Sequence, residues 1–305
     1  MIIRLLMFPF LLICCTISES KQNQNSTTLV VNYDADTDGP FDFHNPDATY
    51  VMDYKLQEIS GLAYDSNTKQ FLTHNDEYGH IHTLDKNFDY KVSEKWAKKG
   101  DYEAIETDDN NVYFLKSNGT ILICNKAEKT MDSHKTQLKT KNETEGLCFD
   151  YKSKNILLLA CKGLPLKKPG EEMNTADKCV YAYNLSTKTL DPNPFLTISD
   201  ASLLEYSQHK EKEGNNSRYK LGKNVKNFAP SGVAVDPMTG DYYIISAKES
   251  LVAIYDTNKK LKTLASFNKK IMPQPEGITF DESGHLYIAT EGKSKSGKVF
   301  KFNRH

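Results

Sequence analysis

Apolar and polar residues alternate in short runs along most of the chain, and these runs recur in a fixed order. Each unit holds a Ser or Glu followed by Gly or Ala, then alternating apolar residues, and ends with Asp before a polar turn. Alternation with a period of two is typical of β-strands, because successive side chains point to opposite faces. Five segments have this pattern: 58–65, 101–108, 143–150, 229–236 and 274–281.

Each of these segments is followed by two further short apolar runs with polar turns between them. The pattern therefore predicts a repeated unit of strand, turn, strand, turn and strand. The second strands are predicted at 70–74, 112–116, 156–161, 242–247 and 286–290. The third strands are predicted at 80–84, 120–124, 179–184, 251–256 and 298–302.

The spacing of the repeats indicates the fold. The aligned small residues are Gly61, Ala104, Gly146, Gly232 and Gly277, which are 43, 42, 86 and 45 residues apart. A period in the low forties is that of a four-stranded propeller blade. We therefore predict an all-β fold, a five-bladed β-propeller. A six-bladed propeller is the alternative, because the double step leaves room for a degenerate blade.

Two insertions account for the double step in the five-bladed interpretation. One, at 164–178, is rich in Lys, Pro, Gly and Glu, and the other, at 200–227, is charged with a weakly helical patch at 201–212. The last blade has only three strands before the chain runs out. We expect an N-terminal strand around 51–56 to add its outer edge and close the ring, which removes an exposed sheet edge. The propeller domain is predicted at 49–305.

The N-terminal segment is typical of an export signal. Residues 1–20 combine Arg4, an apolar run and then small and polar residues, which is the pattern of a signal peptide. Lipidation at Cys15 and plain cleavage near Ser18 or Ser20 are both compatible with it. Residues 21–48 are polar and suit a flexible tether. We expect an exported protein of the bacterial cell envelope, in the periplasm or anchored to a membrane only through a lipid on Cys15.

Composition narrows the classes of partner. The 305 residues include 39 Lys and Arg against 40 Asp and Glu, for a net charge of -1. Such a balance gives no reason to expect a nucleic acid partner, and without coiled-coil heptads we expect a monomer. Four cysteines fall in the domain, without zinc-ligand spacing. Cys148 and Cys161 lie on neighbouring predicted strands, so a disulfide and two buried thiols are both open.

The starts of the inner strands are the candidate site. In a propeller these strands line the central axis, so their first residues form a ring around one mouth. That ring is predicted to hold Ser60, Glu103, Glu145, Ser231 and Glu276. The antiparallel second strands end at the same mouth, with Asn75 or Asp76, Lys116, Lys162, Lys248 and Glu291.

Two interpretations of this mixture of acids and lysines stay open. Glu and Lys from adjacent blades could pair and fix the register of the blades. Alternatively, converging carboxylates repel one another and hold a hard cation through oxygen ligands, as Ca²⁺ prefers. The predicted calcium ligands are Glu103, Glu145, Glu276, Asp76, Asn75 and Glu291. An anionic ligand beside the metal would be bound by Lys116, Lys162 and Lys248.

Several of the repeated motifs resemble a known family. The strongest are Pro230-Ser-Gly-Val-Ala and Gln274-Pro-Glu-Gly-Ile-Thr-Phe-Asp, with further likeness at 58–63, 75–77, 101–105, 143–147 and 288–291. Over about residues 50–305 the chain is similar to the SdiA-regulated (YjiK-like) β-propeller family. The resemblance implies a five-bladed propeller of the bacterial envelope, bound calcium, distant kinship with NHL-repeat propellers and no settled catalytic activity. Ala104 and the insertions depart from the family pattern.

These expectations lead to three functional hypotheses. The first is an exported, calcium-binding propeller that acts as a binding or signalling module for a small molecule or an envelope protein. The second is a calcium-dependent hydrolase, phytase-like or lactonase, that uses the same mouth with a metal-bound water. The third is a protein-binding scaffold without metal that uses the insertions. A propeller fold alone does not choose among them.

Overall fold

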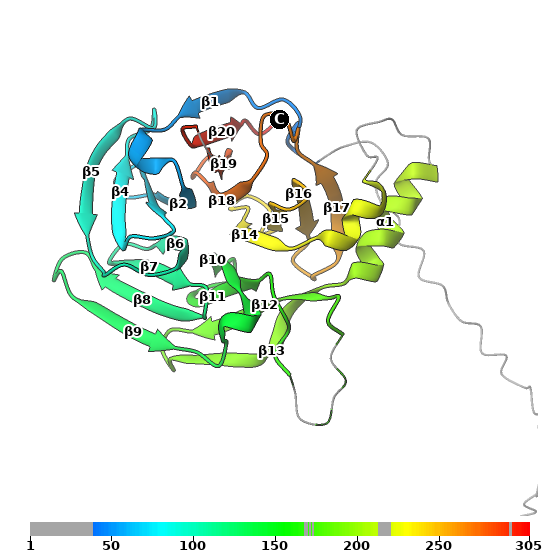
Figure 1. The fold of residues 1–305 in the computed structure, drawn as a ribbon, viewed down its shortest axis with the longest axis horizontal. Helices are drawn as coiled ribbons and strands as arrows, with labels where there is room; N and C mark the ends of the chain where they lie inside the picture. The colour runs from blue at the N-terminus through cyan, green and yellow to red at the C-terminus, as the bar shows by residue number, and fades with distance from the viewer. Residues whose placement is uncertain (1–38, 168–169, 171, 173, 213–220, 293–294) are drawn as a thin grey trace, which may run out of the picture. The chain divides into compact units, whose positions relative to one another are not determined.

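Five antiparallel sheets of four strands surround a common axis in the computed structural model (Figure 1), which describes residues 39–167, 170, 172, 174–212, 221–292 and 295–305. The prediction of a five-bladed β-propeller is confirmed, and the six-bladed alternative is wrong. The double step in the repeat is filled by the two insertions. The predicted signal peptide and residues 21–38 of the predicted tether lie outside the described residues.

The first three blades follow the chain directly, with each blade running from the axis outward. Blade 1 consists of β2 (Ile59–Asp65), β3 (Gln70–Asn75), β4 (His80–Leu84) and β5 (Tyr90–Lys95). Blade 2 consists of β6 (Tyr102–Thr107), β7 (Asn111–Lys116), β8 (Thr120–Asn125) and β9 (Met131–Lys135). Blade 3 consists of β10 (Thr144–Asp150), β11 (Ser153–Cys161), β12 (Lys178–Asn184) and β13 (Thr189–Ile198).

The last two blades follow the second insertion, which forms α1 (Asp200–Lys212) and the short 3-10 helix η4 (Gly222–Asn227) beside β17. A further 3-10 helix, η2 (Thr140–Asn142), precedes β10. Blade 4 consists of β14 (Pro230–Val235), β15 (Tyr242–Ser246), β16 (Leu251–Tyr255) and β17 (Leu261–Ser266). Blade 5 consists of β18 (Pro275–Phe280), β19 (Leu286–Thr290), β20 (Lys298–Phe302) and the N-terminal strand β1 (Ala48–Val51).

Ring closure by an N-terminal strand is confirmed, but the strand lies earlier than expected. β1 pairs antiparallel with β20, from Ala48 opposite Lys301 to Val51 opposite Lys298. Residues 54–56 form the 3-10 helix η1 instead of a strand, because the Asp53 carboxylate accepts a hydrogen bond from the Lys55 amide at 2.9 Å. This side-chain cap stabilises a tight turn at that point.

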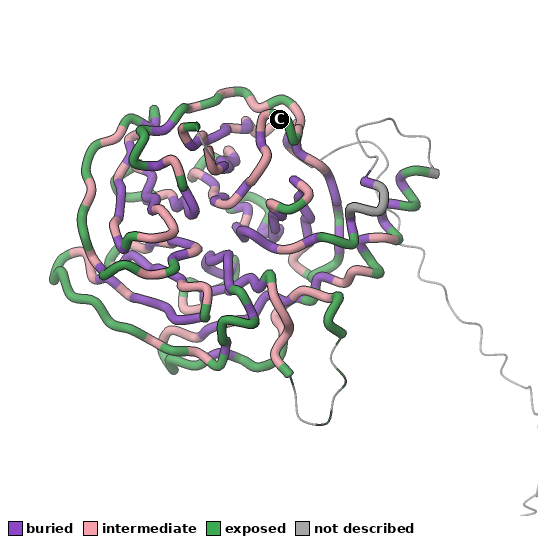
Figure 2. The backbone as a smooth tube through the Cα atoms, viewed as in Figure 1, coloured by how far each residue is buried: buried purple, intermediate pink, exposed green. Residues whose placement is uncertain are grey.

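Burial decreases from the axis to the rim, as Figure 2 shows. Every residue of β15, β16 and β19 is buried, whereas the outer strands β5 and β9 are mostly exposed. The apolar side chains form clusters between neighbouring blades. Hydrophobic contact between adjacent blades therefore holds the ring together.

The repeated Asp at the end of the inner strands closes the turn that follows. In blades 1, 2, 4 and 5 its carboxylate accepts a hydrogen bond from the backbone amide two residues later, which is the geometry of an Asx turn. The pairs are Asp65 with Asn67 at 3.0 Å, Asp108 with Asn110 at 2.8 Å, Asp236 with Met238 at 2.9 Å, and Asp281 with Ser283 at 3.0 Å. The recurrence of Asp at this position of the repeat therefore has a local structural cause.

The inner strands approach one another so closely that a side chain does not fit between them. A Cβ added at Gly146 would lie 2.8 Å from the amide nitrogen of Val233, and one at Gly232 would lie 2.5 Å from the carbonyl oxygen of Glu276. Real Cβ contacts of that length with backbone atoms are essentially absent from proteins. The small residue in each repeat therefore allows neighbouring blades to meet at the axis.

The segment before β1 is part of the core rather than a free tether. Phe43 is 1% exposed, and its ring centroid lies 5.6 Å from that of Phe267 in blade 4 and 6.2 Å from that of Phe302 in blade 5. Phe41 is also buried, against Tyr243 and Phe280. These two rings join the first and last parts of the chain.

Replacement of Phe43 by Ala should therefore loosen the packing between blades 4 and 5. We expect Phe43→Ala to lower the free energy of unfolding by about 3–5 kcal/mol, because a buried aromatic ring is lost and a cavity remains. Urea denaturation followed by circular dichroism measures the change. Tyr54→Ala is the control, since Tyr54 is 76% exposed and its loss should change stability by less than about 0.5 kcal/mol. Equal effects of the two substitutions would contradict this packing.

Candidate functional site

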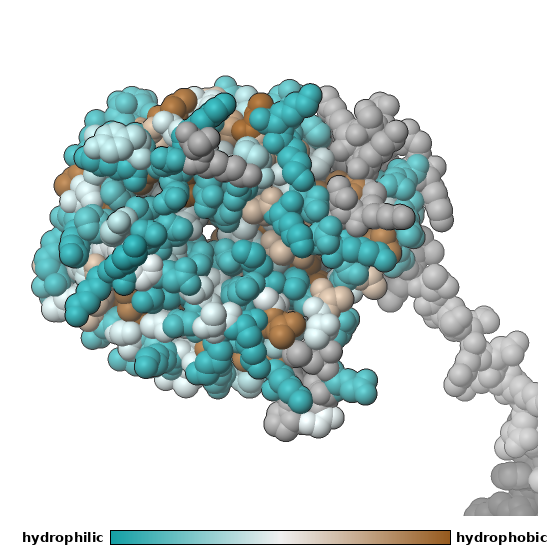
Figure 3. All heavy atoms as spheres, in the orientation of Figure 1, coloured by the Kyte–Doolittle hydropathy of each residue, from teal (hydrophilic) through white to brown (hydrophobic). Residues whose placement is uncertain are grey.

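The predicted ring residues do line the narrowest part of the axis. Ser60, Glu103, Glu145 and Glu276 surround a space of only about 10 Å³, which is roughly the volume that one water molecule needs. The fifth ring residue, Ser231, turns away and donates a hydrogen bond to the Pro275 carbonyl at 2.6 Å. Figure 3 shows a small opening at the centre of the ring, with hydrophilic residues around it. The sequence thus identified four of the residues that line this mouth.

The three ring carboxyls influence one another strongly. Burial, followed by the charges of Glu145 and Asp101, raises the pKa of Glu103 to about 9. Burial, followed by the charges of Glu145 and Glu291, raises the pKa of Glu276 well above its usual range. The pKa of Glu145 is also raised, again mainly by burial. The mouth therefore favours neutral carboxyls or a neutralising cation.

One lysine reaches this ring within the described chain. The Lys162 Nζ lies 3.0 Å from the Glu145 Oε1. Burial opposes the charge of Lys162, but the neighbouring carboxylates of Glu145 and Glu276 outweigh it, so the pKa of Lys162 is raised. The pairing of Glu with Lys that we considered from the sequence is therefore present at one position, and a single cation faces three acids.

The other two predicted lysines lie elsewhere. The Lys116 Nζ is 5.1 Å from the centroid of the Tyr102 ring, a cation–π contact. Lys248 is exposed in the turn between β15 and β16. The three lysines are thus in three different surroundings, and among the described residues Lys162 is the one in contact with a ring carboxylate.

Of the remaining predicted metal ligands, Glu291 is the one whose charge acts on a ring carboxyl among the described residues. The Glu291 carboxylate accepts a hydrogen bond from the side-chain amide of Gln274 at 3.2 Å, and its charge raises the pKa of Glu276. The Asn75 Oδ1 accepts the amide of Tyr78 at 2.8 Å. Burial and the charges of Glu58 and Glu77 raise the pKa of Asp76, and its Oδ1 is buried without a hydrogen-bond partner. Across the residues described, no three His, Cys, Asp or Glu side chains are grouped tightly enough to hold a metal ion.

Sequence reasoning missed a second layer of acids at the same mouth. Asp101 shares a hydrogen bond with Glu103 and helps to raise its pKa, and Glu143 acts on Glu145 in the same way through its charge. Both lie two residues before a ring Glu, immediately before the first residue of β6 or β10. The repeat of acid, any residue, acid at 101–103 and 143–145 was the signal that would have found them.

The cysteines do not form the disulfide considered from the sequence. Cys148 pairs in register with Leu158, whereas Cys161 faces Cys179 on β12. Cys161 lies in the cluster between blades 2 and 3, and Cys148 lines a cavity near the axis. All four described cysteines are free and buried. The hairpin brings the strands together but points the two side chains to different faces.

The comparison with protein families now adds to this geometry. Residues 183–294 match the SdiA-regulated family. That segment runs from the outer edge of blade 3 through blade 4 and into blade 5, and it contains both of the motifs that carried the resemblance most strongly. The SdiA-regulated resemblance read from the sequence is confirmed there. A comparison with curated proteins gives no match.

One solved structure supports the fold, and others have lower similarity. The glutaminyl cyclase of Myxococcus xanthus has a TM-score of 0.53 at 10% identity, over 85% of this chain and 95% of that one. A streptogramin B lyase has a TM-score of 0.46 at 9% identity, over 85% and 97% of the two chains. The WD40 repeats of RRP9 have a TM-score of 0.41 at 13% identity, over 80% and 67%. At such identities the likeness concerns fold alone. Within the described residues, no helix has the length and apolar character to cross a membrane.

The raised pKa of Glu103 predicts how stability depends on pH. The folded state holds the proton more tightly than the unfolded state, whose Glu has a pKa near 4.5. The contribution is therefore complete below about pH 4.5 and is lost as the pH rises towards 9. Glu103→Gln removes this loss, so its midpoint of thermal unfolding should rise relative to wild type by a few degrees at pH 8 and little at pH 5.

Glu282→Gln is the matched control for that measurement. A hydrogen bond from Lys69 lowers the pKa of Glu282 to about 2, so this carboxylate is stabilised as an anion. Its substitution should give no gain at pH 8. A pH-independent effect of Glu103→Gln would contradict the assigned repulsion at the mouth.

Proposed function

We propose that the protein is an exported, calcium-binding propeller of the SdiA-regulated type, in which the ring mouth holds the cation. The observation that carries the proposal is the convergence of Glu103, Glu145 and Glu276 from three blades on a passage the size of one water molecule. Their raised pKa values express a demand for positive charge that Lys162 meets by contact at Glu145 and only through its charge at Glu103 and Glu276. A cation would satisfy that demand.

The donor chemistry of the ring suits calcium. Ca²⁺ takes six to eight oxygen ligands in flexible geometry and accepts carboxylates. Glu103, Glu145 and Glu276 would hold the ion, with Glu291 as a neighbouring carboxylate. The acids are not gathered into a metal cluster in the structure, so binding would require rotation of the Glu side chains towards the axis. Bound calcium would supply charge that fixes the mouth and an open coordination position for a ligand of the module.

Calcium binding should stabilise the fold in a way that the ring acids control. We expect Ca²⁺ to raise the midpoint of thermal unfolding of the EDTA-treated full chain, since a ligand at 100 times its Kd adds about 2.7 kcal/mol. Glu145→Gln should lower the affinity for Ca²⁺, determined from this titration, at least tenfold. Glu94→Gln, on the outer strand β5 and paired with Lys129 at 3.0 Å, should leave it unchanged. Mg²⁺ is titrated separately.

Proton release gives an independent readout. The ring carboxyls that are protonated near neutral pH must lose protons when the cation arrives, so calorimetry in two buffers of different ionisation enthalpy should show release on Ca²⁺ binding at pH 7. Glu103→Gln should reduce that release. Absence of any calcium response in both measurements would leave the ring as structural pairing with Lys162 and refute the proposal.

The hydrolase is the alternative outcome at the same mouth. The passage itself has no room for a substrate, so a phosphate ester or lactone would lie outside it and approach the cation from the face of the ring. Calcium-dependent release of phosphate, or opening of a lactone, that Glu145→Gln abolishes would establish this function instead of a binding module. Cell fractionation with Cys15→Ser as a variant tests export and the lipid anchor.

A further inference from the structure

A second, much larger cavity lies at the other end of the inner strands. Its volume is about 710 Å³, within the range of small-molecule sites and far larger than the 10 Å³ at the acidic ring. All five blades contribute to its lining, through the ends of β2, β6, β10, β14 and β18 and the turns that follow. The axis therefore widens from one face of the propeller to the other.

Small side chains make this widening. Three residues after the ring position, Cys148, Ala234 and Thr279 line the cavity, where Glu106 is the single large side chain at that level. The Glu106 carboxylate accepts the Thr107 amide at 2.8 Å and is partly buried. Burial raises its pKa to about 7, while backbone hydrogen bonds and the charge of Lys154 oppose the shift. Glu106 thus places a carboxyl group at the inner end of the cavity, where the other lining side chains at its level are small.

The lining combines aromatic and apolar surfaces with negative charge. Tyr64, Phe149, Tyr151 and Phe280 contribute rings, and Tyr151 is half exposed at the edge with its ring against Gly240. Lys154 is the only cation among the lining residues, and its Nζ lies 5.0 Å from the Phe149 ring. Six acidic residues line the same cavity: Glu106, Asp108, Asp109, Asp150, Asp281 and Glu282.

Most of these carboxylates accept hydrogen bonds from neutral donors. Asp150 accepts the hydroxyl of Tyr242 at 2.8 Å, and Asp281 accepts the hydroxyl of Tyr287 at 3.0 Å. Asp108 accepts the hydroxyl of Tyr113 at 2.5 Å. Glu282 is the one that pairs with a cation outside the cavity, Lys69 at 2.8 Å. A positive ligand would therefore enter a negative field with apolar walls.

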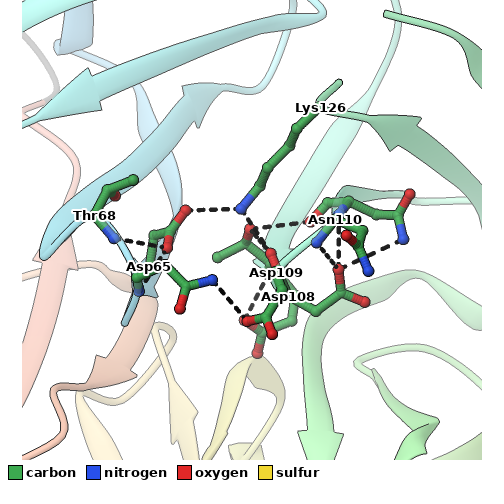
Figure 4. A network of polar contacts seen from close by, with 10 residues as sticks. Asp65, Thr68, Asp108, Asp109, Asn110 and Lys126 are labelled. Atoms are coloured by element: carbon green, nitrogen blue, oxygen red, sulfur yellow. Dashed lines mark hydrogen bonds and ion pairs between the residues drawn. The ribbon is translucent and has the colours of Figure 1, made fainter. Parts of the chain in front are cut away.

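The rim of the cavity is held in place between blades 1 and 2, as Figure 4 shows. The Lys126 Nζ lies 2.7 Å from the Asp65 Oδ2 and donates to the Asp108 carbonyl at 2.6 Å. The Asn67 amide donates to the Asp109 Oδ1 at 2.8 Å. These links join two blades directly at the edge of the cavity. A site fixed in this way loses little order on binding.

We propose that this cavity binds a small organic cation, an amine or amidine on an apolar or aromatic body, with Glu106 as its counter-ion. The rings of Tyr64, Phe149 and Tyr151 contact the body of the ligand, and the surrounding carboxylates exclude anions. The site is separate from the calcium mouth and does not require calcium. It gives the propeller a ligand-binding face opposite to the one proposed for the metal.

Binding of matched probes tests this assignment. Isothermal titration of the full chain in EDTA uses benzamidine and phenethylamine as cations, with benzamide and 2-phenylethanol as their neutral counterparts. The cations should bind at least tenfold more tightly than the neutral compounds. Glu106→Gln, which keeps the shape of the side chain, should weaken cation binding at least tenfold, and Glu94→Gln should not change it.

A second variant keeps the test independent of Glu106. Tyr151→Ala removes an exposed wall of the cavity and should weaken the aromatic cations more than the aliphatic cation agmatine. Thermal unfolding confirms that each variant is folded. Equal binding of charged and neutral probes, or unchanged binding in Glu106→Gln, would overturn the proposal. Binding of an Arg-rich peptide without binding of the small cations would overturn the assignment to a small ligand. Because EDTA is present throughout, failure here is distinct from failure of the calcium proposal.

Discussion

The close approach of the five inner strands is the constraint on which the rest of the structure depends. At Gly146 and Gly232 a neighbouring backbone occupies the place where a Cβ would lie, so adjacent blades meet without side chains between them. The residues at the preceding position then line the axis, except Ser231, which turns away. Three of them are carboxylates, Glu103, Glu145 and Glu276, and the charge of Glu145 raises the pKa of the other two. The geometry of packing thereby creates the chemistry of the mouth.

The repeat in the sequence carried most of the information about the fold. The alternation and the period near 43 residues predicted the blades, and the ring Glu residues followed from their place at the start of the inner strands. The position of β1 was harder to predict, because Ala48–Val51 and the segment near Tyr54 are both short runs that could form the strand. The Asp53 cap makes the second of them a 3-10 helix. Asn75 was predicted as a ligand from its position alone, while its side chain closes a local turn.

The wide cavity was hidden from sequence reasoning for a different reason. The cavity has its volume because the side chains of Cys148, Ala234 and Thr279 are small. Turns from all five blades complete its lining. No single segment carries that signal, since each small residue is compatible with ordinary strand packing. Glu106 also follows the alternation of its strand like any polar residue. Only the common axis shows that these positions meet.

The net charge of the chain is near zero, although acidic residues gather at both ends of the axis. Many lysines pair with acids away from the axis, such as Lys129 with Glu94 and Lys262 with Asp241, so the total stays near zero while both ends of the axis remain rich in carboxylates. The two ends differ in the space around those carboxylates. A passage of about 10 Å³ admits an ion and a cavity of about 710 Å³ admits a molecule. Under the two proposals, one electrostatic preference, for positive charge, would select ligands of different size at the two faces of one propeller.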